Sequence, residues 1–154
     1  MPLIEIVTMI GAPVDRVFDL SRSIDAHILS AEGSGESAVG GRTSGLIELG
    51  ETVTWEAVHL GLRQRLTVEI TRFDGPRMFE DEMTEGAFAS MRHVHRFERL
   101  AEGTMMRDEF SFAAPFGILG RLAEILFLTQ YMRRFLITRN RCLKEMAESG
   151  QWHG

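Results

Sequence analysis

A long amphipathic stretch near the end of the chain, residues 118–147, constrains the fold more than any other feature of the sequence. Its mostly apolar positions recur at alternating steps of three and four, which is the spacing of one face of an α-helix. They are Ile118, Leu122, Ile125, Thr129, Met132, Leu136, Leu143 and Met146. At 1.5 Å per residue such a helix runs about 45 Å. We therefore expect one long helix, with Leu122 and the rest of this face buried against the remainder of the protein.

The chain before this helix favours short antiparallel strands. Runs rich in β-branched and aromatic residues cover residues 3–9, 46–49, 51–60, 62–73, 78–84, 90–100 and 104–113. Connections as short as those between these runs join antiparallel neighbours. Pro13 predicts a short helix after the first strand, and Ser23 or Asp25 predicts a second helix over residues 23–28. Residues 32–45 are rich in Gly and Ser, which indicates a loop with one edge strand.

Length, charge and composition exclude several classes of protein. With 154 residues, 44% of them hydrophobic, the chain fits a single α+β domain over residues 1–154 with a sizeable core. A net charge of -5 disfavours nucleic acid as a partner. Charged residues interrupt every long apolar run, so we predict no membrane insertion, and we find no signal peptide. The lone Cys142 cannot form an internal disulfide, so we expect a cytoplasmic protein.

Six parts of the sequence carry a resemblance to a known superfamily. They are residues 12–18 (APVDRVF), 50–57 (GETVTWEA), 73–79 (FDGPRMF), 93–98 (HVHRFE), 103–109 (GTMMRDE) and the last helix. Together they resemble the SRPBCC (START and birch-pollen-allergen-like) superfamily, which includes polyketide cyclase/dehydrase-like proteins. The resemblance implies a helix-grip fold, in which a curved antiparallel sheet of six or seven strands wraps around the last helix. It also implies a cavity between sheet and helix for an apolar or amphipathic small molecule.

Strand alternation predicts which polar groups face that cavity. His93, His95 and Phe97 share one face of their strand. We expect this face to point inward, because the opposite face carries Arg96 and Glu98, which prefer water.

Two carboxylates are predicted on the same inner surface. A two-residue turn at 101–102 or 102–103 brings Asp108 either directly opposite His95 or diagonal to it. The same alternation places Asp81 on the inner face and Glu80 on the outer one. A carboxylate beside an imidazole is suited to proton transfer. The candidate catalytic residues are therefore His95, Asp108, His93 and Asp81, although these groups can equally satisfy one another without chemistry.

The remaining site predictions concern ligands and metals. The expected ligand-binding wall consists of Trp55, Ala57, His59, Phe79, Met83, Phe97, Met106, Phe110, Phe112, Ile125, Thr129 and Met132. The His-x-His pattern places two imidazoles on one side of a strand, as some metal sites do. Because the sequence offers no firm third ligand, we predict no metal and no cofactor.

Three functions remain open from the sequence alone. The favoured hypothesis is binding of a lipid-, polyketide- or quinone-like small molecule, because apolar residues are abundant on the predicted inner faces. A cyclase- or dehydratase-type enzyme that uses the inward His/Asp pair is the second. The third is an interaction protein that docks through an exposed apolar face of the last helix, and a homodimer is one such complex. Whether the protein is an enzyme stays open.

Overall fold

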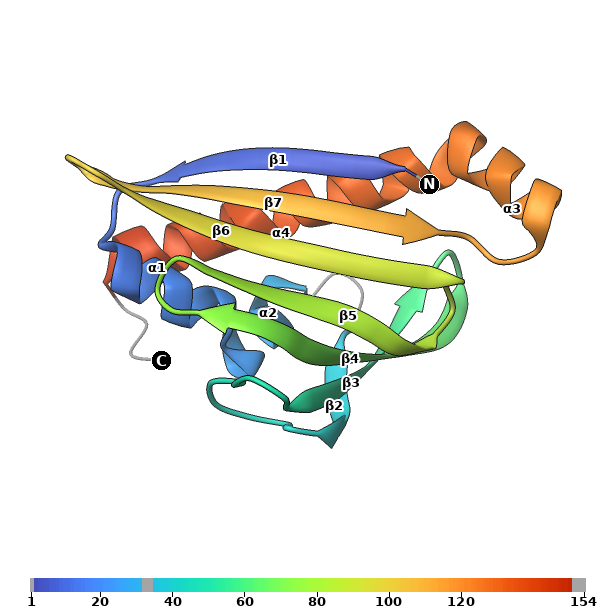
Figure 1. The fold of residues 1–154 in the computed structure, drawn as a ribbon, viewed down its shortest axis with the longest axis horizontal. Helices are drawn as coiled ribbons and strands as arrows, with labels where there is room; N and C mark the ends of the chain where they lie inside the picture. Colours follow the sequence, from blue (N-terminus) through green and yellow to red (C-terminus); the bar gives the residue numbers. More distant parts are fainter. Residues whose placement is uncertain (1, 32–34, 151–154) are drawn as a thin grey trace.

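In the computed structural model, which describes residues 2–31 and 35–150, seven strands form one antiparallel sheet in the order β1-β7-β6-β5-β4-β3-β2 (Figure 1). The strands are β1 (Leu3–Ile10), β2 (Ser37–Gly41), β3 (Thr52–His59), β4 (Leu62–Asp74), β5 (Met78–Gly86), β6 (Ser90–Leu100) and β7 (Gly103–Ala113). The helices are α1 (Val14–Ser21), α2 (Ile24–Ser30), α3 (Gly117–Ala123) and α4 (Thr129–Ser149), with a π-helical turn η2 (Glu124–Leu128) between the last two. The predicted α+β helix-grip architecture is confirmed.

One predicted strand is absent from the described residues. Within residues 46–49, only Leu46 forms a single bridge, to Ser23. The backbone here pairs with the link between α1 and α2 instead, since Ile47 N donates to Arg22 O at 3.2 Å and Ile24 N donates to Gly45 O at 2.9 Å. The predicted edge strand of the glycine-rich loop is β2, whereas residues 32–34 of that loop lie outside the described residues.

Two tight turns set the register of the strands that carry the candidate site. Leu60 and Gly61 both have positive φ, 54° and 78°, as two-residue hairpin turns require, so His59 pairs with Leu62. At the β6–β7 turn, Leu100 pairs with Gly103 across Ala101 and Glu102. This is the first of the two predicted registers.

The two short helices hold the C-terminal end of α4. Ser23 caps α2, because its hydroxyl accepts a hydrogen bond from Ala26 N at 3.1 Å. Arg16 of α1 donates to the carbonyl oxygens of Ala147 and Met146 at 2.9 and 3.3 Å. These carbonyls end the last turn of α4, where a cation is electrostatically favourable.

The last helix differs from the prediction in its first third. In α4 the buried positions are Leu136, Arg139, Asn140, Leu143 and Ala147, which form one helical stripe. Further upstream, Ile118 is 85% exposed, Leu122 51% and Ile125 81%, so the prediction that this part of the face is buried is wrong.

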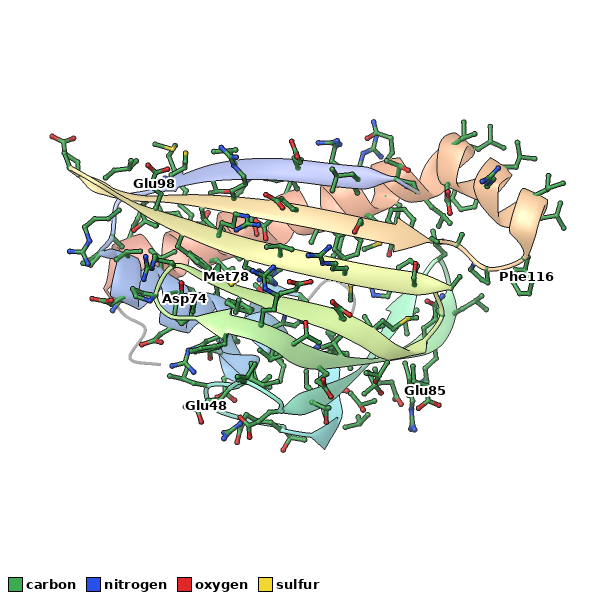
Figure 2. The ribbon with its side chains drawn as sticks, in the orientation of Figure 1. Glu48, Asp74, Met78, Glu85, Glu98 and Phe116 are labelled. Atoms are coloured by element: carbon green, nitrogen blue, oxygen red, sulfur yellow. The ribbon has the colours of Figure 1, made fainter. Side chains whose placement is uncertain are left out.

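The π-helical turn explains the difference. It inserts roughly one extra residue into the helix, which rotates everything upstream of it by about 100° relative to a continuous α-helix. In addition, α3 lies beyond the ends of β1 and β7, where no strand faces it (Figure 1). Phe116, at the start of this segment, marks the same end of the molecule in Figure 2.

None of the described helices is both long and apolar enough to cross a membrane.

A second difference concerns the outer face of the sheet. Glu80 does point outward, but its carboxylate is only 1% exposed instead of being solvated. Arg92 and Arg72 from the neighbouring strands cover it, and both form ion pairs with it. The alternation of the strand predicted the direction of this side chain, but not that two guanidinium groups would bury it.

Candidate functional site

A cavity of about 240 Å³ lies between the concave face of the sheet and the last helix. Most of its wall is apolar: Trp55, Ala57, Leu66, Val68, Phe88, Met91, Phe110, Leu128, Met132, Phe135 and Leu136. Four largely buried polar side chains, those of Glu36, Asp81, His93 and Arg139, also line it. A mostly apolar wall with a few polar groups is typical of sites for small molecules.

The structure places the predicted wall residues in two groups. Trp55, Ala57, His59, Phe110 and Met132 line the cavity. The others do not line it: Phe79, Met83, Phe97, Met106, Phe112, Ile125 and Thr129.

Different parts of the fold account for the second group. Phe79 and Phe97 meet the ring of Phe18 edge-on, with ring centroids 5.6 and 5.3 Å apart, because α1 covers their end of the sheet. Met106 and Phe112 are completely buried in the core. Strand alternation identified the inner face, but it does not tell which part of that face a helix fills.

Several lining residues were not predicted. Tyr131, Phe135 and Arg139 of α4 line the cavity at helical spacing, one turn apart. From α2, the His27 ring stacks on Trp55 with centroids 4.0 Å apart. For the α4 residues, the signal was present in the sequence, since 131, 135 and 139 continue one face, but an arginine on a helix ordinarily indicates a solvated surface.

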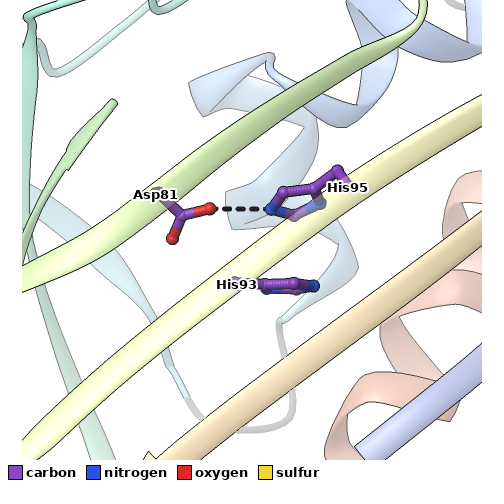
Figure 3. A group of neighbouring side chains, drawn as sticks. All are labelled: Asp81, His93 and His95. Atoms are coloured by element: carbon purple, nitrogen blue, oxygen red, sulfur yellow. Dashed lines mark hydrogen bonds and ion pairs between the residues drawn. The ribbon is translucent and has the colours of Figure 1, made fainter. Parts of the chain in front are cut away.

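Two histidines and two aspartates form a hydrogen-bonded cluster beside the cavity. His93 Nε2 lies 2.7 Å from Asp108 Oδ1, and His95 Nε2 lies 2.7 Å from Asp81 Oδ1. Figure 3 shows the second of these contacts and the stacking of the two imidazoles, whose centroids are 3.7 Å apart. In the backbone register His95 is directly opposite Asp108. Its Nδ1 nevertheless lies 3.5 Å from the Asp108 carboxylate, farther than the two hydrogen-bonded contacts.

Residues of α4 complete the surroundings of Asp108. Its Oδ2 accepts a hydrogen bond from Asn140 Nδ2 at 2.7 Å. The guanidinium of Arg139 lies further away, with Nη1 4.0 Å from Asp108 Oδ1. The cluster therefore joins the sheet to the last helix through a carboxylate that is completely buried.

The two histidines have opposite pKa shifts. Burial and the positive charge of His95 lower the pKa of His93 to about 4, against the opposing hydrogen bond with Asp108. Burial acts in the same direction on His95, but the 3.5 Å contact with the Asp108 carboxylate and the hydrogen bond with Asp81 outweigh it and raise the pKa of His95. Although burial alone would raise the pKa of Asp81 and of Asp108, hydrogen bonds from the histidines lower both. His95 is thus the more readily protonated of the two stacked imidazoles, and His93 stays neutral down to a lower pH.

The geometry favours a proton network over a metal site. Asp81, His93 and His95 do offer three ligand atoms within 4.8 Å of one another. However, the imidazole planes are only 26° apart in a stack, so the in-plane lone pairs of the two rings run nearly parallel and do not converge on one ion. The Nε2 atom of His95 is moreover hydrogen-bonded to Asp81 itself.

Comparison with known proteins supports the fold. No protein-family model matches the sequence, and no curated protein matches it. Among solved structures, a protein from Thermus thermophilus is 19% identical with a TM-score of 0.79, covering 98% of this chain and 100% of its own. A START superfamily protein from Mycobacterium smegmatis is 8% identical with a TM-score of 0.73, covering 97% of this chain and 99% of its own. The ginseng (Panax ginseng) major latex-like protein is 15% identical with a TM-score of 0.70, covering 95% and 97%. The predicted resemblance to the SRPBCC superfamily is confirmed at the level of the fold.

Proposed function

We propose that this protein binds a hydrophobic or amphipathic small molecule in the cavity between the sheet and α4, as a cytoplasmic, single-domain binding protein. The observation that carries the proposal is the cavity itself, whose apolar walls enclose a few buried polar groups. Aromatic side chains such as Trp55, Phe88 and Phe110 supply rigid contact surface for a ring system. The free thiol of Cys142 accords with a reducing compartment.

Binding is better supported than acid/base catalysis by the His/Asp cluster. A general base works best with a pKa near the working pH, and the pKa of His93 is about 4. His95 has the more suitable pKa, but it does not line the main cavity and both its ring nitrogens face carboxylates. Turnover of a polyketide-like compound that disappears in His95→Ala would reverse this ranking.

Filling the cavity is expected to block an apolar probe. Ala57 and Phe110 are buried in its wall, so Ala57→Trp and Phe110→Trp place extra ring volume where the ligand lies. We expect the wild type to bind the neutral fluorophore N-phenyl-1-naphthylamine with micromolar affinity. Each variant should weaken this binding by about tenfold or more, which corresponds to about 1.4 kcal/mol. Fluorescence titration measures the effect.

Leu62→Trp is the matched control for the filling variants. Leu62 is exposed and does not line the cavity, so this variant adds the same side chain elsewhere and should bind the probe like the wild type. Circular dichroism checks that all three variants are folded. Unchanged binding in Ala57→Trp and Phe110→Trp would place the probe outside this cavity.

The exposed part of the last helix favours self-association as a second function. Ile118, Leu119, Leu122, Ile125 and Leu126 are all exposed and lie on one side of the helix. Arg121 is the only exposed charged residue in this segment, since Glu124 is buried and accepts from Ala114 N. A face without charge offers no ion pairs to a charged partner, whereas two copies related by a two-fold axis bury it against itself.

Replacing this face with charge is expected to abolish a dimer. Sedimentation velocity over a concentration series should show a dimer for the wild type and a monomer for Ile118→Glu/Ile125→Glu, because each carboxylate would be buried unpaired in the interface. Glu69→Gln, a half-buried position on β4 away from this helix, is the control and should remain dimeric. A monomeric wild type at every concentration would refute self-association.

A further inference from the structure

Arg139 is a buried cation whose Nε has no hydrogen-bond partner among the described residues. Its side chain is on the buried stripe of α4, and the residue is 4% exposed. Within residues 2–31 and 35–150, no group accepts a hydrogen bond from its Nε, and its one ion pair is the 4.0 Å contact with Asp108. A guanidinium has five N–H donors in a planar fork, and buried donors that stay unpaired cost free energy.

The neighbouring carboxylates are already engaged with other donors. Asp108 accepts from His93 through Oδ1 and from Asn140 through Oδ2, both at 2.7 Å. Asp81 accepts from His95 at the same distance. Asp108 therefore neutralises Arg139 only partly and at a distance, and neither carboxylate offers the guanidinium the two parallel hydrogen bonds that it is shaped to make.

Arg139 also lines the cavity, which makes a ligand the natural acceptor. The surrounding wall is apolar and includes Phe110 and Phe135, so the rest of such a ligand has to be apolar too. With about 240 Å³, the cavity suits a compact ring system and is small for a long acyl chain.

We propose that Arg139 anchors the carboxylate of a compact aromatic or alicyclic acid, whose apolar body fills the cavity. This rests on the proposed ligand-binding function and narrows it to a chemical class. The surroundings of the anchor allow it, because the nearby carboxylates of Asp108 and Asp81 are already hydrogen-bonded to other side chains. Glu36, which also lines the cavity, is paired with His27 at 3.0 Å. The acidic groups that a carboxylate meets beside Arg139 are thus already paired with other side chains. Bidentate pairing with a guanidinium in a site of low dielectric is one of the stronger recognition contacts available to a protein.

A matched pair of probes tests the anchor. 1-Naphthoic acid and 1-naphthalenemethanol carry the same ring system, and only the first is an anion at neutral pH. Titration by calorimetry should show that the wild type binds the acid at least about tenfold more tightly than the alcohol, a difference of about 1.4 kcal/mol. Arg139→Met should abolish this preference and leave binding of the alcohol unchanged.

Two further variants separate the anchor from effects on folding. Arg139→Lys keeps the charge and loses the planar guanidinium, so it should retain only part of the preference for the acid. This variant replaces Arg139→Met in the test if Arg139→Met does not fold. Arg141→Met removes an exposed cation from the same helix and should behave like the wild type.

The outcomes distinguish a failure of the Arg139 anchor from a failure of the proposed ligand-binding function. If neither probe binds the wild type, while N-phenyl-1-naphthylamine also fails, the proposed function is wrong. Equal affinity of the wild type for the acid and the alcohol overturns the anchor alone. So does a preference for the acid that survives in both Arg139→Met and Arg139→Lys.

Discussion

Leu136→Asp is expected to unfold the protein, whereas Leu122→Asp is expected to leave it folded. Leu136 is 3% exposed in the interface between α4 and the sheet, and an unpaired charge there should lower the free energy of unfolding by about 4 kcal/mol or more. Leu122 is 51% exposed on α3, so the same substitution should change that free energy by less than about 1 kcal/mol. Urea unfolding followed by circular dichroism measures both.

This pair of substitutions also tests the π-helical turn. A continuous α-helix through residues 118–147 would place Leu122 and Leu136 on the same buried face, as the sequence pattern predicted. Similar losses of stability in the two variants would therefore show that Leu122 is buried in solution, against its exposed position on α3 in the structure. Leu122→Ala and Leu136→Ala report the same contrast without introducing a charge, with about 2–5 kcal/mol expected for the buried position.

Asp108→Asn is expected to lower the pKa of His95 and to destabilise the fold by about 3 kcal/mol near neutral pH. The substitution keeps the shape of a completely buried side chain and removes the charge that faces His95 and Arg139. NMR titration of the His95 ring measures the pKa, which should stay partly raised, because Asp81 still accepts from Nε2. An unchanged titration of His95 would show that the two groups do not interact. Asp15→Asn, at an exposed position of α1, is the control.

The opposite pKa shifts of the two histidines predict the pH dependence of stability in the wild type. Because the pKa of His95 is raised, its contribution is complete below the unfolded value of 6.5 and fades as pH rises through the folded value. His93 acts in the other direction, because the unfolded chain takes up its proton near pH 6.5 and the folded protein only near pH 4. Acidification across this range therefore lowers the free energy of unfolding by roughly 3 kcal/mol. The lowered pKa values of Asp81 and Asp108 add a further loss in stronger acid.

Stability should therefore be greatest close to the ordinary histidine pKa and fall on both sides of it. Urea unfolding measured across the pH range tests this shape. In Asp108→Asn the decline above neutral pH should weaken, because His95 then has a smaller pKa shift. A stability curve that is flat between pH 4 and the ordinary histidine pKa would contradict the assignment of a neutral His93.

The sequence predicted the sheet and one of its key pairs because strands have a simple geometric rule. Side chains alternate between two faces, and a two-residue turn at Ala101 and Glu102 fixes the register, so the position of His95 opposite Asp108 could be derived from spacing. The hydrogen bonds of the cluster could not be derived from spacing. They run from His93 to Asp108 and from His95 to Asp81, since side chains lean along the strand and three strands contribute to the cluster.

Charged residues were the main source of error, because their burial depends on partners from other elements. Glu80 was expected in water, but Arg72 and Arg92 bury it. The charge of Arg139 likewise favours a position in water. Its spacing from Leu136 and Leu143, three before and four after, places it on the buried stripe, and this was the signal that could have identified it. Pattern alone gives the side of the helix; only the packed structure shows what a cation on that side contacts.

The π-helical turn η2 has an evolutionary consequence. It separates the helix into two parts whose orientations about the helix axis are set independently: α4 is fixed by the sheet, and α3 by the number of residues in the turn. Losing or gaining one residue there would rotate the outward-facing apolar surface by about 100°, and of the residues in the turn only Leu128 lines the cavity. Changes in length at this one turn therefore alter the outer surface of the helix without a substitution in the sheet residues that line the cavity.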